Sequence, residues 1–266
     1  MELWFWLIYL AVGLFVGFLT GLLGIGGGTV IVPILSLIFA AKGFPADHVI
    51  HMALGTSLAS IIIGSFSSAR EHHLHNAVDW TLVKRLAPGI VFGTISGAVF
   101  AHFVAVAFLK TFFVGLVFFI AFQMIFGVKA KPIRSSLPGT AGIIIFGYFM
   151  GFVSSLAGIG GAVLTISFLV MCGVGLHQAI GTAAAVGIPI AVAGTVGFII
   201  TGLLDASLPS GSLGYVYLPA WLGIAVASYF IAPYGARLAH RMPVDVMKKT
   251  FMVFILGLAV WMAVSV

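Results

Sequence analysis

Two glycine-rich runs contain the residues of this chain that are best suited to chemistry. The first is GLLGIGGGTVIVP at 21–33, and the second is GFVSSLAGIGGAVLTI at 151–166. The first amide N–H groups of a helix have no partner within that helix, and its aligned peptide dipoles add a partial positive charge there. Because glycine lets a ligand approach these amides without a Cβ in the way, both runs are candidate anion sites made of backbone.

A segment containing a Gly-Thr pair follows each run. The first is HMALGTSLA at 51–59, and the second is HQAIGTAAA at 177–185. Their hydroxyls can donate to an oxyanion or bond back to their own helix, and the sequence leaves both readings open. The predicted substrate-binding residues are Gly26, Gly27, Gly28, Thr29, Gly55, Thr56, Ser57, Gly160, Gly161, Gly181 and Thr182.

A histidine precedes each Gly-Thr pair by four residues, which places it one turn away on the same helical face. These residues are His51 and His177. A histidine near the membrane interface can take up a proton at physiological pH, so both are candidates for proton coupling. Burial at the interface without a function remains an equal alternative.

The composition requires a membrane. Hydrophobic residues make up 62% of the 266 residues and charged residues only 7%, against about 45–50% and about 25% in soluble domains. Apolar stretches near ~18 residues, the length that a bilayer core demands of a helix, recur along the chain. We therefore expect an all-α polytopic membrane protein. Met1 and Glu2 offer no positive region of a cleaved signal peptide, so the first segment is expected to stay.

Turn signals and charges divide the chain into about ten membrane segments. The second and seventh are short for full spans, so we expect broken or re-entrant helices at the glycine motifs. The expected segments are 3–22, 26–41, 47–66, 82–104, 109–127, 138–156, 160–173, 177–202, 213–233 and 246–265.

Basic residues are divided unequally between the two sides of these segments. Lys42 and Lys110 fall on the N-terminal side. The opposite side has Arg70, Lys84, Arg85, Lys129, Lys131, Arg134, Arg237, Arg241, Lys248 and Lys249. The positive-inside rule then makes the opposite side cytoplasmic and puts both termini outside the inner membrane. The net charge of +6 thus reflects topology and anionic headgroups rather than nucleic acid.

The chain also repeats itself. The run at 17–32 returns at 151–166, an offset of 134, and 51–59 returns at 177–185, an offset of 126. Five segments in each half give the halves opposite orientations, as in the inverted repeats of secondary transporters. The expected units are a first repeat at 1–128, a cytoplasmic linker at 129–137 and a second repeat at 138–266.

Other kinds of site are less favoured. All six acidic residues fall in loops or at segment ends, so the interior offers a cation no carboxylate. The single cysteine, Cys172, excludes a disulfide within the chain and a cysteine-based metal cluster. Three histidines, His72, His73 and His75, are expected in a solvated loop, and we expect no metal site and no cofactor. A hydrolase would need a Gly-x-Ser-x-Gly or His-Glu-x-x-His motif, and the chain has neither, so we expect no enzyme.

The paired GIGGG and GIGG runs, each preceded by a Gly-Phe pair, and the GTS and GT segments resemble the TauE/SafE sulfite-exporter family over nearly the whole chain. The resemblance implies proton-coupled export of sulfur-containing anions such as sulfite, sulfonates or sulfoacetate across a bacterial or archaeal inner membrane. Ala162 and Ala183 depart from the motifs of the first half, which puts a symmetric site in doubt.

The sequence therefore predicts a secondary transporter that moves small anions by alternating access. Its expected partners are the anion, protons and the lipid bilayer, and the chain is compatible with a homodimer. Two alternatives stay open: a histidine-dependent permease for divalent metals or protons, and an accessory subunit that has no substrate of its own.

Overall fold

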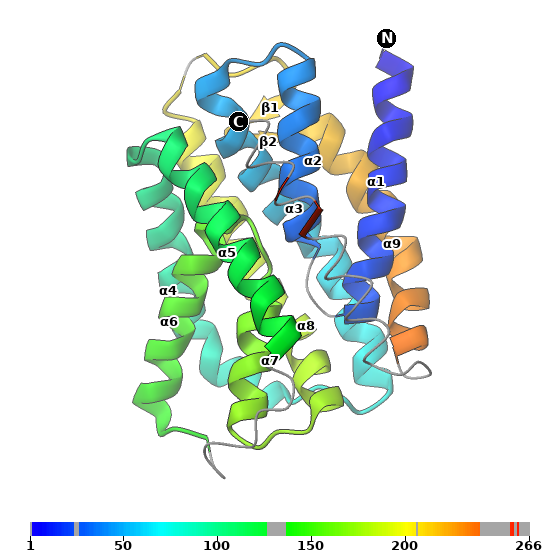
Figure 1. Cartoon of the computed structure of the whole chain (residues 1–266), viewed down its shortest axis with the longest axis vertical. Helices are drawn as coiled ribbons and strands as arrows, with labels where there is room; N and C mark the ends of the chain where they lie inside the picture. Colours follow the sequence, from blue (N-terminus) through cyan, green and yellow to red (C-terminus); the bar gives the residue numbers. More distant parts are fainter. Residues whose placement is uncertain are drawn as a thin grey trace.

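The computed structural model describes residues 2–23, 27–126, 137–205 and 207–239, together with Leu256, Gly257 and Val260. These residues form nine helices and one hairpin (Figure 1). The helices are α1 (Glu2–Leu23), α2 (Gly28–Ala41), α3 (Ala46–Leu74), α4 (Trp80–Phe103), α5 (Val106–Phe126), α6 (Thr140–Ala157), α7 (Ala162–Met171), α8 (Leu176–Gly202) and α9 (Leu218–Ala239). They match the first nine expected segments, and most of the tenth, 246–265, lies outside the described residues.

Six of these helices are long and apolar enough to cross a membrane, namely α1, α3, α4, α6, α8 and α9. They confirm the all-α polytopic class. The second and seventh segments form short helices, with 14 residues in α2 and 10 in α7. At ~1.5 Å per residue these helices measure about 21 and 15 Å, less than the ~30 Å core of a bilayer. Neither one crosses a membrane by itself.

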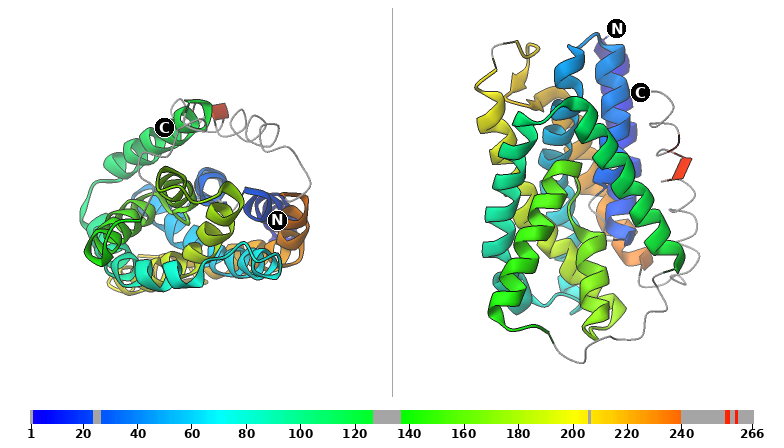
Figure 2. Two further views of the ribbon diagram at one scale, coloured as in Figure 1. Left: turned by 90° about the horizontal axis from the view of Figure 1, so that it is seen from below. Right: turned by 60° about the vertical axis from the view of Figure 1, so that its left-hand side comes forward.

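The two short helices approach each other from opposite ends of the molecule. From the end that holds the N-terminus, α1 descends and α2 returns to that same end, whereas α6 rises from the opposite end and α7 returns to it (Figures 1 and 2). The bends of these two hairpins touch, because a Cβ added to Gly28 would collide with the carbonyl oxygen of Gly158. Two segments that are far apart in the chain therefore meet inside the bundle.

The long helices pack in pairs around a central pair. The most extensive contacts join α1 to α9 and α4 to α6, while α3 and α8 pack on each other and on α9 and α4 respectively. Glycines allow this close approach: a Cβ on Gly17 would lie 2.5 Å from Ser228 Cα, and one on Gly93 would collide with Tyr148. Small residues at helix contacts are usual in membranes, where van der Waals packing drives helix association.

The helix α3 is longer than the sequence predicts. The expected segment ended at residue 66, but α3 continues to Leu74 and has 29 residues, or about 44 Å. Its last turns are polar, which hydropathy reads as a loop, yet Glu71 and His72 are buried there. The expectation of a solvated loop was therefore wrong for His72, whereas His73 is exposed on the last turn of α3 and His75 is exposed in the turn that follows.

A short hairpin precedes α9, where the sequence predicts helix from residue 213. Strand β1 (Ser212–Leu213) pairs antiparallel with β2 (Val216–Tyr217), with Ser212 opposite Tyr217. The turn between the strands contains Gly214 at a φ of 52°, a left-handed conformation that suits glycine. The helix therefore begins only at Leu218.

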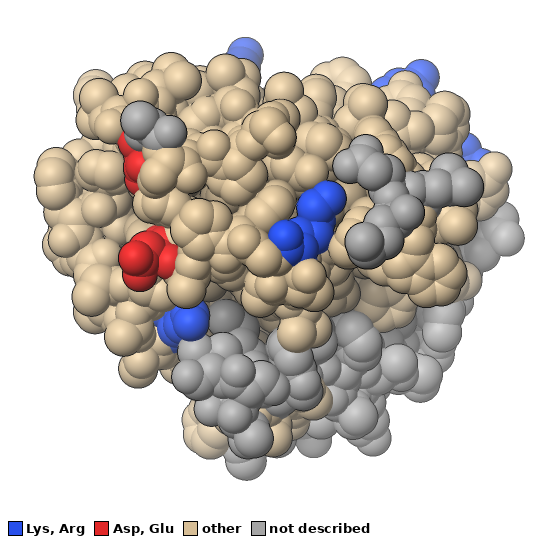
Figure 3. Space-filling view, turned by 90° about the horizontal axis from the view of Figure 1, so that it is seen from above, with Lys and Arg blue, Asp and Glu red and all other residues tan. Residues whose placement is uncertain are grey.

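The described basic residues divide between the two ends of the molecule. Figure 3 shows the end that holds the N-terminus, where most of the surface is uncharged. Lys42 follows α2 and Lys110 lies in the first turns of α5, and both of these helix ends lie at this end of the molecule. The opposite end holds Arg70, Lys84, Arg85 and Arg237, and the other six basic residues lie outside the described residues.

Candidate functional site

A left-handed glycine begins each short helix. Gly27 caps α2 and Gly161 caps α7, both with a φ of 67°. Neither cap has a side-chain hydrogen bond, so the first amides of both helices depend on other partners. The prediction that both glycine runs mark helix starts is confirmed by these two caps.

A hydroxyl of the preceding helix lies beside each capping glycine. A Cβ added to Gly27 would lie 2.8 Å from Thr20 Oγ1, and one added to Gly161 would lie 2.8 Å from Ser154 Oγ. Neither hydroxyl is among the substrate-binding residues predicted from the sequence. The available signal was their shared place in the repeated run, because Ser154 follows Thr20 at the same offset of 134 residues.

Two hydroxyls near these bends have no hydrogen-bond partner among the described residues. They are Thr29 Oγ1, in the first turn of α2, and Ser154 Oγ, in the last turn of α6. Thr29 is 0% exposed and Ser154 is 1% exposed. A buried hydroxyl without a partner costs about 1–3 kcal/mol, so each of these groups needs an explanation.

Other predicted hydroxyls are engaged by the protein itself. Ser57 Oγ donates to the carbonyl oxygen of Gly158 at 2.8 Å and so connects α3 to the bend between α6 and α7. Thr56 Oγ1 accepts from the amide of Tyr217 at 2.9 Å, and Thr182 Oγ1 accepts from the amide of Asp79 at 3.0 Å. The two threonines thus hold the connections that enter α9 and α4.

Close contacts with the backbone of connecting segments account for the glycines of the two Gly-Thr pairs. A Cβ on Gly55 would lie 2.7 Å from the carbonyl oxygen of Tyr215, and one on Gly181 would collide with the carbonyl oxygen of Ala77. Gly160 lies in the connection between α6 and α7, where its carbonyl oxygen would be 3.6 Å from a Cβ on Gly187. Gly26 lies outside the described residues.

The two candidate histidines have different surroundings. His51 is buried, with Nε2 at 2.9 Å from the carbonyl oxygen of Ala101 and Nδ1 at 3.2 Å from that of Asp47. A neutral imidazole has one N–H, so only the protonated ring can donate to both carbonyls. His177 is exposed in the first turn of α8. Among the two, only His51 is held inside the helix bundle.

A second polar cluster lies at the end of the molecule that holds the N-terminus. His48 Nδ1 lies 3.2 Å from Asp205 Oδ2, and His102 Nδ1 lies 3.2 Å from the hydroxyl of Tyr215. The Ser207 hydroxyl donates to Asp205 Oδ1 at 2.7 Å and lowers the pKa of that carboxyl. Burial raises the pKa of Tyr215 to about 12, so its phenol stays protonated.

The histidine-rich turn at the other end makes local contacts rather than a metal site. Arg237 Nε of α9 donates to Glu71 Oε1 at 2.9 Å. His75 Nδ1 lies 2.9 Å from the carbonyl oxygen of Glu71, and Trp80 Nε1 donates to His73 Nδ1 at 3.1 Å. Over the part of the chain that the structure describes, no group of three or more histidine, cysteine or acidic side chains could hold a metal ion.

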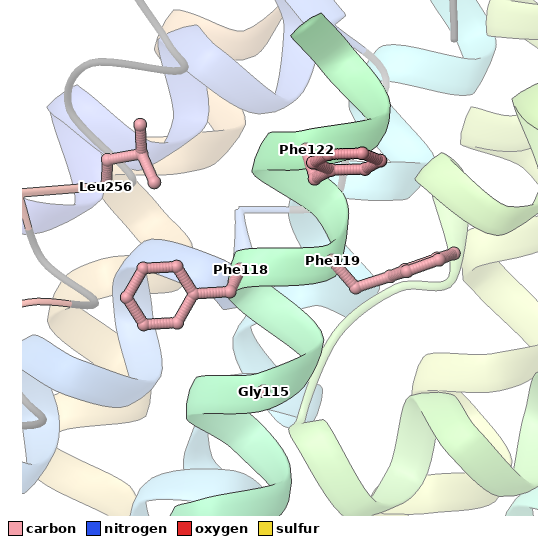
Figure 4. A pocket seen from close by; sticks show the side chains of 5 residues that line it. All are labelled: Gly115, Phe118, Phe119, Phe122 and Leu256. Carbon is pink, nitrogen blue, oxygen red and sulfur yellow. The ribbon is translucent and has the colours of Figure 1, made fainter. Parts of the chain in front are cut away.

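An apolar groove of about 490 Å³ lies on the outer side of α5 (Figure 4). It is lined by Gly115, Phe118, Phe119, Phe122 and Leu256. None of these residues has a polar side chain, so the groove is unsuited to a small anion and suits an apolar surface such as lipid.

Comparisons with known proteins show which family the chain resembles. The family model for the sulfite exporter TauE/SafE matches residues 9–262. A "Probable membrane transporter protein" of Haemophilus influenzae is 36% identical over 256 residues, covering 96% of this chain and 97% of the relative. "Probable membrane transporter protein YdhB" of Bacillus subtilis is 28% identical over 240 residues, covering 88% and 90%. No solved structure matches the chain significantly. From the match along nearly its whole length, the chain belongs to the TauE/SafE sulfite exporter family of membrane transporters.

Proposed function

We propose that this chain is a secondary transporter that exports small sulfur-containing anions, such as sulfite, sulfonates or sulfoacetate, across the inner membrane. The family match and the relatives named as membrane transporters support this proposal. The observation that carries it is the contact between the start of α2, at Gly28, and the bend at Gly158, which ends α6 and leads into the start of α7. Two helix N-termini attract an anion without any basic side chain.

Inverted repeats over 1–128 and 138–266 would generate this arrangement. Pairs of equivalent contacts support the repeat: α1 packs on α9 as α6 packs on α4, and α2 packs on α3 as α7 packs on α8. The bonds from the Tyr217 amide to Thr56 and from the Asp79 amide to Thr182 form a further equivalent pair. Movement of one half against the other would expose the shared site to each side in turn.

Protons are the proposed coupling ions, and His51 is the proposed proton acceptor. Its two ring nitrogens face two carbonyl oxygens, which a protonated ring satisfies and a neutral ring does not. Both termini are proposed to lie outside, since the end with Arg70, Lys84 and Arg85 then faces the cytoplasm.

Reconstitution of the purified chain alone into liposomes tests the proposal. We expect flux of radiolabelled sulfite that is saturable, accelerated by a pH gradient and inhibited by unlabelled sulfoacetate. Empty liposomes are the control. An accessory subunit would produce no flux of any of these anions, and a histidine-dependent permease would instead transport a divalent cation such as Zn²⁺. Either result would overturn the proposal.

A further inference from the structure

The hydroxyl of Ser154 is buried without a hydrogen-bond partner among the described residues, which is unfavourable unless a ligand accepts its hydrogen bond. It is 1% exposed, has no hydrogen-bond partner in the described part of the chain, and lies 2.8 Å from where a Cβ on Gly161 would be. It therefore faces the bend at which α7 begins. The start of α7 has no side-chain cap, so its first backbone N–H groups lack a side-chain acceptor. The buried Ser154 hydroxyl lies beside these N–H groups.

Two neighbouring hydroxyls donate to backbone carbonyl oxygens, which is the usual alternative to binding a ligand. Ser155, the next residue, donates to the carbonyl oxygen of Phe152 at 2.9 Å. Thr165, in the first turn of α7, donates to the carbonyl oxygen of Gly161 at 2.9 Å. Serines in helices usually form such bonds to their own backbone. Ser154 does not, although it is as deeply buried as these two residues.

We propose that Ser154 is an anion-binding residue, and that its hydroxyl donates to an oxygen of an anion held at the start of α7. This inference rests on the proposed transport function and extends it to a residue outside the predicted set. Thr29, in the first turn of α2, is the other buried hydroxyl near the bends that has no partner in the described part of the chain.

The change Ser154→Ala tests the inference because binding and stability should respond in opposite directions. Removing a buried donor that lacks a partner leaves the thermal stability of the ligand-free protein unchanged or higher. Removing a hydrogen bond to a bound anion weakens the affinity for sulfite at least about tenfold. A purely structural serine would lose stability and keep its affinity.

The experiment uses the full chain in detergent, with sulfite titrated against the melting temperature and chloride as the reference salt. Ser155→Ala is the matched control, because it removes an adjacent buried hydroxyl that already has a partner. We expect it to lower the melting temperature and to leave the dissociation constant for sulfite unchanged. Ser154→Thr keeps a hydroxyl, as at Thr20 in the first half, and should therefore bind sulfite more tightly than Ser154→Ala.

The outcomes separate this inference from the proposed function. If the unmodified protein binds sulfite and Ser154→Ala binds it equally well, Ser154 is not a ligand and the transport proposal stands. If the unmodified protein binds no sulfur oxyanion, the transport proposal itself fails. Should Ser154→Ala not fold, Ser154→Cys keeps the volume with a weaker donor and is expected to show the same loss of affinity.

Discussion

The two bends share a capping glycine and differ in the residue that follows it. At the first bend, Gly27 is followed by Gly28, and at the second, Gly161 is followed by Ala162. A Cβ on Gly28 would collide with the carbonyl oxygen of Gly158, whereas Ala162 buries its Cβ at the corresponding place. The left-handed cap is therefore the common requirement, and the extra glycine serves the contact between the bends.

The hydroxyls around the bends also differ between the halves. Ser57 of α3 donates to the carbonyl oxygen of Gly158, whereas its counterpart on α8 is Ala183. Thr29 follows the first cap, and Val163 holds the corresponding place after the second. The second half therefore has fewer hydroxyl donors near its bend than the first half, as its alanine substitutions in the sequence indicate. The proposed anion would meet more hydroxyls from the first half.

Valine at either capping glycine has the largest expected effect and tests whether the bends are equivalent. A left-handed φ costs a non-glycine residue about 1–2 kcal/mol, and valine at Gly27 would also collide with Val16. We expect Gly27→Val and Gly161→Val each to reduce sulfite flux in liposomes at least about tenfold. Gly115→Ala, on the outer side of α5, is the control. Normal flux in either valine variant would show that its bend does not hold the anion.

Exchanging glycine and alanine at the residue after each capping glycine should show how much stability depends on the close contact between the bends. Gly28→Ala places a methyl group against the Gly158 carbonyl, so we expect a loss of about 1–3 kcal/mol, as for an overpacked core. Ala162→Gly creates no collision, but it adds freedom to the unfolded chain and removes one buried methyl group, which together cost about 1–2 kcal/mol. Melting temperatures in detergent measure both. A Gly28→Ala variant as stable as the unmodified protein would contradict the collision assigned to the first bend.

Much of this fold could be predicted from the sequence, because the described helices follow from hydropathy. Hydropathy fails where tertiary contacts decide the outcome. The end of α3 is polar by composition, yet Glu71 is buried there and pairs with Arg237, and the turn at Gly214 replaces expected helix with a hairpin.

The candidate site was predictable only in part. Glycine spacing along the chain locates the bends, because a backbone feature leaves its mark in the sequence. The direction of the Ser154 side chain depends on how α6 lies beside the start of α7, which is a tertiary property. For the same reason the sequence could not show that Thr56 and Thr182 hold the connections that enter α9 and α4.

Removing the Ser57 hydroxyl should affect the second bend by a smaller amount. Ser57→Ala leaves the buried carbonyl oxygen of Gly158 without this donor, so we expect a loss of about 1 kcal/mol in unfolding free energy. Ser60→Ala, one turn along α3, removes a local bond to the carbonyl oxygen of Thr56 and is the matched control for stability. Only Ser57→Ala should speed hydrogen exchange in residues 158–165. If both variants change exchange there equally, Ser57 does not act on the bend.

The smallest expected effect is an acid-induced loosening of the 203–217 connection, which enters α9. The hydroxyl of Ser207 lowers the pKa of Asp205, so the folded state favours the carboxylate. That contribution is fully present above the ordinary aspartate pKa of about 3.9 and is lost as the pH falls below it. Hydrogen exchange in this connection should rise below about pH 4, after correction for the intrinsic rate. Asp205→Asn should remove this pH dependence, and an unchanged profile would contradict it.

The length of α3 has a consequence for how the protein sits in its bilayer. His48 near its start and Glu71 near its end are roughly 35 Å apart at ~1.5 Å per residue, slightly more than the ~30 Å of hydrocarbon. The contacts of these residues with Asp205 and Arg237 would then lie in the two headgroup layers. The spacing of these two contacts along α3 would therefore set the membrane thickness that the protein fits. A thicker membrane would place the charged groups of these contacts in the hydrocarbon core.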